Sequence, residues 1–168
     1  MKAIAKLGIP EETFWKYNIN DFAREPPQKA YREAVSNRAL KYFRIDGDHM
    51  YGQGYVDNIK AFLYNGYAMF TGFPAYDNIY KITRTQPVLH FPTISNKLLG
   101  GHAVMICGYD DEMNYNMGKG CFLCQNSWDV SYADRGFFWM PYKFFSDALA
   151  IDTWTATSIE WVYTGVFN

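Results

Sequence analysis

The sequence has little of several features that mark specialised classes of protein. Its 16 basic and 17 acidic residues give a formal net charge of −1, so no positive excess is available to bind nucleic acid or an anionic membrane surface. No apolar run approaches the roughly 18 residues that cross a bilayer, and Lys2 and Lys6 interrupt the region where an export signal would form. We therefore expect a soluble protein without an export signal, and neither nucleic acid nor membrane as a partner.

Cysteine is also scarce. Cys107, Cys121 and Cys124 are an odd number within a short stretch, which does not fit the disulfide framework of a small secreted domain. Cys121 and Cys124 form a C-x-x-C pair, but no second Cys/His pair stands at the spacing of a zinc finger. We expect free thiols, no metal and no cofactor.

What is present is enough for a core. Hydrophobic residues fill 49% of the 168 positions, and no linker or internal repeat divides the chain. Helical spacing and stop signals predict a short helix beginning at 8–12 and further helices over 27–39 and 56–63. Apolar runs of strand length follow at 67–73, 102–109, 121–125 and 136–140. Helices first and strands last predict an α+β fold.

Two other polar features look structural or solvent-exposed. The segment 46–54 is rich in Asp and Gly but does not have the ligand pattern of a calcium loop, so we expect its acidic residues to be solvated. His49 and His90 stand in no motif, and we expect them at the surface.

One histidine has a more informative setting. His102 follows two glycines at the start of a predicted strand, and Asn126 closes another, with Trp128 two residues later. An amide oxygen can orient an imidazole without adding charge, and an indole over the pair would exclude water. The alternative is a buried structural histidine near an ordinary strand end, and the residue types alone leave both readings open.

The flanking motifs resemble a known family. In order along the chain, the sequence carries the motifs Gly101-His102-Ala103-Val104, Gly108-Tyr109-Asp110, Asn126-Ser127-Trp128 and Gly136-Phe137-Phe138. Together they are similar to the carboxyl-terminal half of papain-like cysteine peptidases of the C1 family. Downstream, Trp139-Met140-Pro141-Tyr142 and the Trp154 segment are similar to the bacterial and viral branches of this family.

This resemblance implies a fold and a set of roles. His102 would be the catalytic histidine, Asn126 its orienting partner and Trp128 the shielding tryptophan, with Gly101, Ala103 and Trp128 in the substrate cleft. The expected fold is the α+β papain-like fold, with residues 1–54 as the remnant of a helical lobe and residues 55–168 as a β-rich, β-barrel-like lobe.

The sequence also departs from the family pattern. Asp129 stands where the family has glycine, and Tyr132-Ala133 replaces its Trp-Gly pair. These changes alter the wall expected on the leaving-group side of the cleft.

The largest departure concerns the nucleophile. In this family the cysteine precedes the histidine by about 130–150 residues, but no cysteine precedes His102 here. Strand alternation points Cys107 away from His102 and predicts that it is a core residue. Cys124 shares strand parity with Asn126, but it would lie on the β-rich lobe and not across the cleft.

We therefore expect the carboxyl-terminal part of a cysteine peptidase, inactive by itself, whose substrate is a peptide or protein. The alternatives are a pseudo-peptidase that binds peptide or protein without cleaving it, and a decayed structural remnant. The face near His102 would be covered by the missing Cys-bearing segment, by a second copy, or by residues 1–41 folding back.

Overall fold

The computed structural model describes residues 1–47 and 51–158. The described residues form two compact units: residues 1–43 with residues 156–158 belong to unit 1, and Arg44–Thr155 make unit 2. The division at residues 54 and 55 that the sequence suggests stays a prediction. None of the helices in the described ranges is both long and apolar enough to cross a membrane.

Unit 1 is built around two short helices. It contains α1 (Lys2–Leu7), η1 (Ile19–Asp21), α2 (Gln28–Ala34) and η2 (Val35–Asn37). Gly8 ends α1 with φ +84°, and a Cβ there would lie 1.7 Å from the carbonyl oxygen of Ala34, so this close approach requires glycine. The buried residues of α2 are Ala30 and Ala34.

Two sequence-based helix boundaries in unit 1 are wrong. Residues 8–12 begin no helix, because Gly8 instead ends α1 and turns follow it. The helix predicted over 27–39 ends at Ala34 and is followed by the 3-10 turn η2, in which the side chains of Ser36 and Asn37 donate hydrogen bonds to the backbone carbonyls of Glu33 and Ile9.

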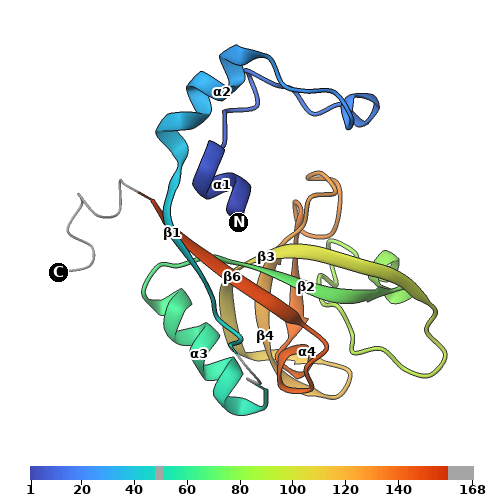
Figure 1. Ribbon diagram of the computed structural model, residues 1–168. Helices are drawn as coiled ribbons and strands as arrows, with labels where there is room; N and C mark the ends of the chain where they lie inside the picture. The colour runs from blue at the N-terminus through green and yellow to red at the C-terminus, as the bar shows by residue number, and fades with distance from the viewer. Residues whose placement is uncertain (48–50, 159–168) are drawn as a thin grey trace. The chain divides into compact units, whose positions relative to one another are not determined.

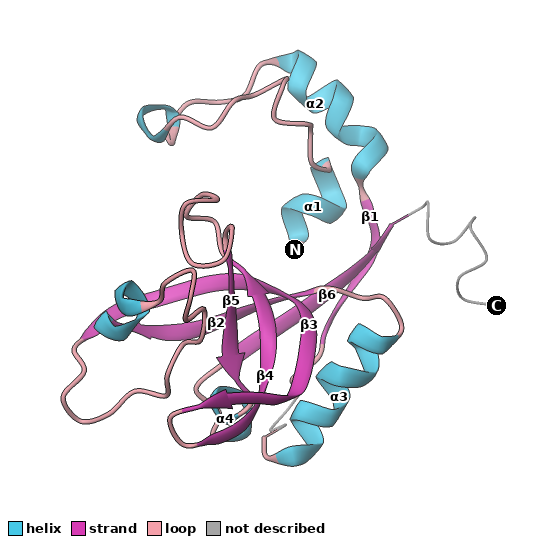
Figure 2. Cartoon of the chain, turned by 180° about the vertical axis from the view of Figure 1, so that it is seen from behind, coloured by secondary structure: helices cyan, strands magenta, loops and turns pink. Residues whose placement is uncertain are grey.

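Unit 2 carries most of a six-stranded sheet with strand order β1-β6-β2-β3-β4-β5 (Figures 1 and 2). The strands are β1 (Ala39–Arg44), β2 (Met69–Tyr76), β3 (Leu98–Tyr115), β4 (Gly118–Gln125), β5 (Phe137–Pro141) and β6 (Ile151–Ser158). The α+β class is confirmed. Within the described residues β1 and β5 remain the edges, so the sheet is open and not the barrel-like one expected.

Helices and short turns complete unit 2. They are α3 (Gln53–Tyr64), η3 (Asp77–Lys81) and α4 (Lys143–Ser146). The helix α3 packs against β3 and α4, and it buries Tyr55, Val56 and Ile59 at the predicted helical spacing. The long connection containing η3 joins β2 to β3, and it matters for the site described below.

The segment after β1 corrects one expectation. Asp46 is 5% exposed and not solvated. Its carboxylate accepts hydrogen bonds from the Arg44 guanidinium at 2.8 and 2.9 Å and from the backbone N–H groups of Asp152 and Thr153. The expectation failed because two of these donors come from β6, far along the chain. His90 is exposed as expected, and His49 lies outside the described residues.

The position of Cys107 corrects a second expectation from the sequence. The β3–β4 register pairs Ile106 with Cys124 and Gly108 with Leu123, so Cys107 is the extra residue of a β-bulge. It lies on the opposite side from the buried residue Ile106, as alternation predicts, but it is exposed and not part of the core.

Candidate active site

The sheet topology brings His102 and Asn126 to the same place. β3 and β4 are antiparallel neighbours in which Met105 pairs with Gln125. His102 lies near the start of β3 and Asn126 directly follows β4, so both stand at the same end of the two strands.

The two side chains are joined by a hydrogen bond. Nε2 of His102 lies 2.9 Å from Oδ1 of Asn126, and the backbone N–H of Ser127 donates to the same oxygen at 2.8 Å. A backbone N–H only donates, so the atom that Ser127 contacts is the amide oxygen. An amide oxygen only accepts, so Nε2 carries the hydrogen and Nδ1 is the free base of the neutral ring. The predicted proximity of these residues is confirmed.

Asn126 is buried and its backbone is fixed by a hydrogen bond. It is 8% exposed, and its backbone N–H donates to the carbonyl of Gly136 at 2.9 Å. Its amide nitrogen Nδ2 is buried and makes no hydrogen bond to any residue that the structure describes. The oxygen of the Asn126 amide therefore accepts hydrogen bonds, whereas its nitrogen makes none with the described residues.

Aromatic rings surround the histidine. The Trp128 ring lies 4.9 Å from the His102 ring, between centroids, and is tilted by 31°, so the predicted packing is also confirmed. Phe73, which pairs with His102 across β2 and β3, meets its ring edge-on at 5.7 Å. Tyr80 stacks on Trp128 at 5.7 Å, and Tyr132 meets it edge-on at 5.1 Å. These contacts limit the access of water to the hydrogen bond.

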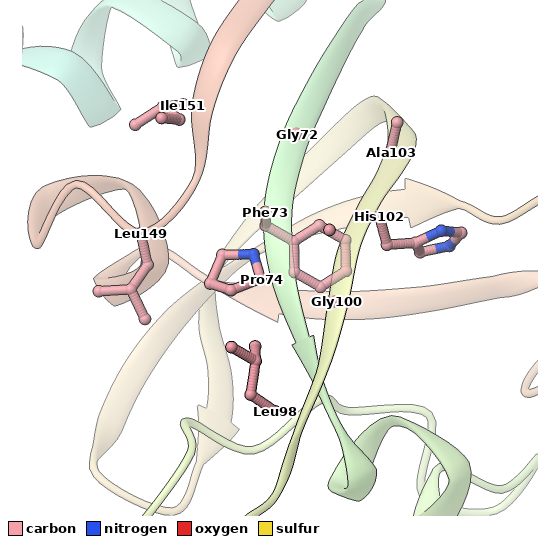
Figure 3. A pocket seen from close by; sticks show the side chains of 10 residues that line it. Gly72, Phe73, Pro74, Leu98, Gly100, His102, Ala103, Leu149 and Ile151 are labelled. Carbon is pink, nitrogen blue, oxygen red and sulfur yellow. The ribbon is translucent and has the colours of Figure 1, made fainter.

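Two pockets meet at His102. The larger has a volume of about 660 Å³, and its walls are almost wholly apolar (Figure 3). Its lining comprises Gly72, Phe73, Pro74, Leu98, Gly100, Gly101, His102, Ala103, Leu149 and Ile151. The smaller, of about 170 Å³, is lined by Ala75, Tyr80, Leu99, Gly100, Gly101, His102 and Trp128.

The two pockets share Gly100, Gly101 and His102. No atom lies within 4 Å of where a Cβ on either glycine would stand, so the strand beside the histidine is open to a ligand. Of the cleft residues predicted from sequence, Gly101 lines both pockets, Ala103 the larger and Trp128 the smaller.

None of the cysteines in the described chain lines either pocket. Burial raises the pKa of Cys124 well above its usual value and that of Cys121 to about 12. Desolvation also raises the pKa of Cys107, whose thiol donates to the Leu123 carbonyl. Such thiols are poor nucleophiles near neutral pH. No group of three potential metal ligands occurs among the described residues.

The loop between β4 and β5 explains how two departures from the expected motif are accommodated. Asp129 has φ +77° and Ala133 has φ +48°. Both replace glycines of the pattern, and both keep the left-handed conformation that glycine adopts freely. Asp tolerates it better than Ala, and the Asp129 carboxylate accepts from the N–H of Ser131 at 3.0 Å.

Sequence reasoning missed several residues around the histidine. Tyr80 comes from η3, Phe73 from β2 and Ile151 from β6, and none of them stands in a motif. They reach the site through strand pairing and through the fold of the β2–β3 connection. No local signal could have identified them.

Comparison with known proteins agrees with this geometry. The family model described as papain family cysteine protease matches residues 1–151. The chain belongs to this family. It is 32% identical over 158 residues to an uncharacterized peptidase C1-like protein of Acanthamoeba polyphaga mimivirus, covering 92% of this chain and 49% of that protein.

Solved papain-family structures have the same fold. Xylellain, a cysteine protease from Xylella fastidiosa, superposes with a TM-score of 0.77 and 28% identity, covering 94% of this chain and 59% of that one. Bromelain from Ananas comosus superposes with a TM-score of 0.62 and 18% identity, covering 94% and 66%. The chain thus spans about half the length of its viral relative and 59% of xylellain.

Proposed function

We propose that this chain supplies the histidine–asparagine part of a papain-type cysteine peptidase, and that the nucleophilic thiol comes from polypeptide outside these 168 residues. The hydrogen bond between His102 and Asn126, beside an open cleft, is the observation that carries the proposal. It leaves Nδ1 of His102 as the atom that exchanges a proton with a thiol and then with the leaving amine.

The reaction assigns a role to each neighbouring residue. The thiolate attacks the peptide carbonyl, and the imidazolium at His102 gives its proton to the departing amine. Water then hydrolyses the acyl-enzyme with His102 acting as base. Asn126 keeps the ring oriented, and Trp128 shields the hydrogen bond from water. Gly101 and Ala103 line the cleft in which the peptide lies.

The shape of the cleft suits an extended peptide. A bound peptide that lies along Gly100 and Gly101 could place one apolar side chain in the larger pocket and a smaller group beside Trp128. Leu98, Leu99 and Tyr80 are 56%, 44% and 68% exposed around these pockets. Exposed apolar surface of this kind next to the histidine favours an interface with the Cys-bearing segment. If light scattering showed that the chain is a dimer, a second copy of the chain would be favoured as the partner instead.

Binding can be tested with the chain itself. Titration with short peptides carrying Leu or Phe should shift the backbone NMR signals of Gly100, Gly101 and Ala103. The variant Gly101→Ala should weaken binding about tenfold by occupying the cleft, without unfolding the chain. Gly54→Ala is the matched control, since Gly54 also has open space around it but lies on α3. Absence of binding, or equal loss in both variants, would contradict the proposed cleft.

A second candidate function is a pseudo-peptidase that binds peptide without cleaving it. The observation favouring it is that residues of this chain alone line the two pockets beside His102, while none of its described cysteines does. The nucleic acid upstream of the Met1 codon distinguishes the two. An in-frame Gln followed closely by Cys, giving peptide hydrolysis when expressed with these residues and no hydrolysis in His102→Ala, supports the peptidase. An in-frame stop codon with peptide binding retained supports the pseudo-peptidase.

A further inference from the structure

Tyr132 occupies an unusual position beside the candidate site. Its ring meets Trp128 edge-on, with 5.1 Å between centroids and 79° between planes. Its hydroxyl donates a hydrogen bond to the backbone carbonyl of Ile79 at 3.0 Å. This bond spans 53 positions and joins the β4–β5 loop to the β2–β3 connection.

The residue that accepts this hydrogen bond, Ile79, is also next to a residue that contacts Trp128. Ile79 is fully buried in η3, and the next residue, Tyr80, stacks on Trp128 with 19° between planes. The indole is therefore contacted by two tyrosines from two segments. The Tyr132 hydroxyl links those segments next to Trp128, and an ion pair of 4.0 Å between Arg84 and Asp134 links them elsewhere. The indole in turn lies against His102.

Tyr132 also faces the amide that orients the histidine. Burial raises the pKa of the Tyr132 phenol, and the Asn126 side chain offsets part of this rise. Nδ2 of Asn126 is the buried side-chain nitrogen that the described residues leave without a hydrogen bond.

We propose that Tyr132 is a positioning residue of this site, whose hydroxyl, by holding the Ile79 carbonyl, keeps Trp128 and Tyr80 packed over the hydrogen bond between His102 and Asn126. Calling it a positioning residue rests on the proposed function, whereas the protection of the hydrogen bond does not. A phenylalanine at this position keeps the ring contacts but leaves the Ile79 carbonyl without its donor.

The protection can be measured on the 168-residue chain without any catalysis. Exchange of the His102 Nε2 proton with water, followed by NMR, should be about tenfold faster in Tyr132→Phe, and the cross-relaxation between the rings of Trp128 and His102 should weaken. Tyr142→Phe is the matched control, because its hydroxyl bonds to Asp111 and its ring packs on Phe122. That variant should leave both signals unchanged. Equal exchange rates in the two variants would overturn the proposal.

A second variant keeps the test decisive if Tyr132→Phe fails to fold. Tyr80 is 68% exposed, so Tyr80→Ala removes its stacking on Trp128 and its part of the smaller pocket's wall without opening the core. It should also accelerate exchange of the Nε2 proton, and an unchanged rate would overturn the proposal. In a form that hydrolyses peptides, Tyr132→Phe should lower kcat and leave KM nearly unchanged. Absence of hydrolysis in every form would count against the proposed function alone, since the exchange rates are read independently.

Discussion

Oδ1 of Asn126 accepts the hydrogen of Nε2 of His102 at 2.9 Å, although the two residues are 24 positions apart. The same oxygen accepts a hydrogen bond from the N–H of Ser127. The Asn126 amide therefore cannot exchange the positions of its oxygen and nitrogen without losing two hydrogen bonds. The neutral ring is therefore fixed in one tautomer, with Nδ1 unprotonated. A general base needs this property before any question of its proton affinity arises.

Removal of the amide should release the tautomer. In Asn126→Ala the Nε2 proton has no acceptor, and we expect the ratio of the two neutral tautomers to shift about fivefold toward the Nδ1–H form. The nitrogen chemical shifts of the ring at alkaline pH measure this ratio. Asn65→Ala, which removes an exposed amide at the end of α3, serves as control. A ring that stays wholly in the Nε2–H form in Asn126→Ala would exclude the orienting role.

The thiols should be slow to react. Burial raises the pKa of all three cysteines, so the reactive thiolate should be a smaller fraction of each at pH 7 than of a free thiol, and the rate of labelling should increase with pH. We expect Cys107, the exposed one, to react first with a disulfide reagent, and peptidyl epoxides to label none of the three. The unfolded chain, in which all three react, is the control. Stoichiometric labelling of Cys124 that disappears in His102→Ala would show that a local thiol works with the histidine.

The sequence allowed the core of the site to be predicted because its information is local. Strand patterns around His102 and Asn126 place each residue at a strand end, and antiparallel pairing of neighbouring strands then brings those ends together. The family motifs contain the same two segments. Trp128 follows because it is only two residues from Asn126.

Other features depend on contacts that no local pattern records. Asp46 reads as a solvated loop residue, but it accepts from β6, more than a hundred positions away. Cys107 follows strand alternation, but it is the extra residue of a β-bulge and is exposed. Tyr80 and Ile151 reach the cleft only through the β2–β3 connection and the position of β6 beside β2.

The larger pocket predicts a preference for apolar side chains. Ile151 lines this pocket and is 49% exposed, so Ile151→Lys should fold normally and place a charge in an apolar wall. Affinity for peptides with Leu or Phe should fall about tenfold, since burial of such a side chain contributes about 1.5–3 kcal/mol. Ile94→Lys, at a fully exposed position outside both pockets, should change nothing in the same titration. Equal affinities in the two variants would place the apolar side chain elsewhere.

Backbone strain in the β4–β5 loop should be removable. Ala133 is buried and has φ +48°, a conformation that costs a residue with a Cβ about 1 kcal/mol. Ala133→Gly relieves this cost but increases the entropy of the unfolded chain, so we expect a net gain of at most about 0.5 kcal/mol in the free energy of unfolding. The same substitution at an α2 position with ordinary helical φ, Ala30→Gly, should destabilise by about 1 kcal/mol or more. Urea unfolding of both variants compares them, and a clear loss of stability in Ala133→Gly would contradict the strain.

The last prediction concerns the carboxylate that holds β6 in place. Burial alone would raise the pKa of Asp46, but the hydrogen bonds from Arg44 and from the Asp152 backbone outweigh it and lower the pKa below its usual value. A carboxyl with a lowered folded-state pKa stabilises the fold above its unfolded pKa of about 3.9, and this contribution is lost as the pH falls through the folded-state pKa.

Asp46→Asn should therefore cost about 2 kcal/mol at pH 7, measured by urea unfolding, because an amide cannot accept both guanidinium hydrogen bonds. The difference from the parent chain should shrink as the pH falls below about 4. Asp57→Asn, at an exposed position of α3, should show neither effect. If Asp46→Asn matched the parent at pH 7, or differed from it equally at every pH, the carboxylate would not be what secures Ile151 at the wall of the cleft.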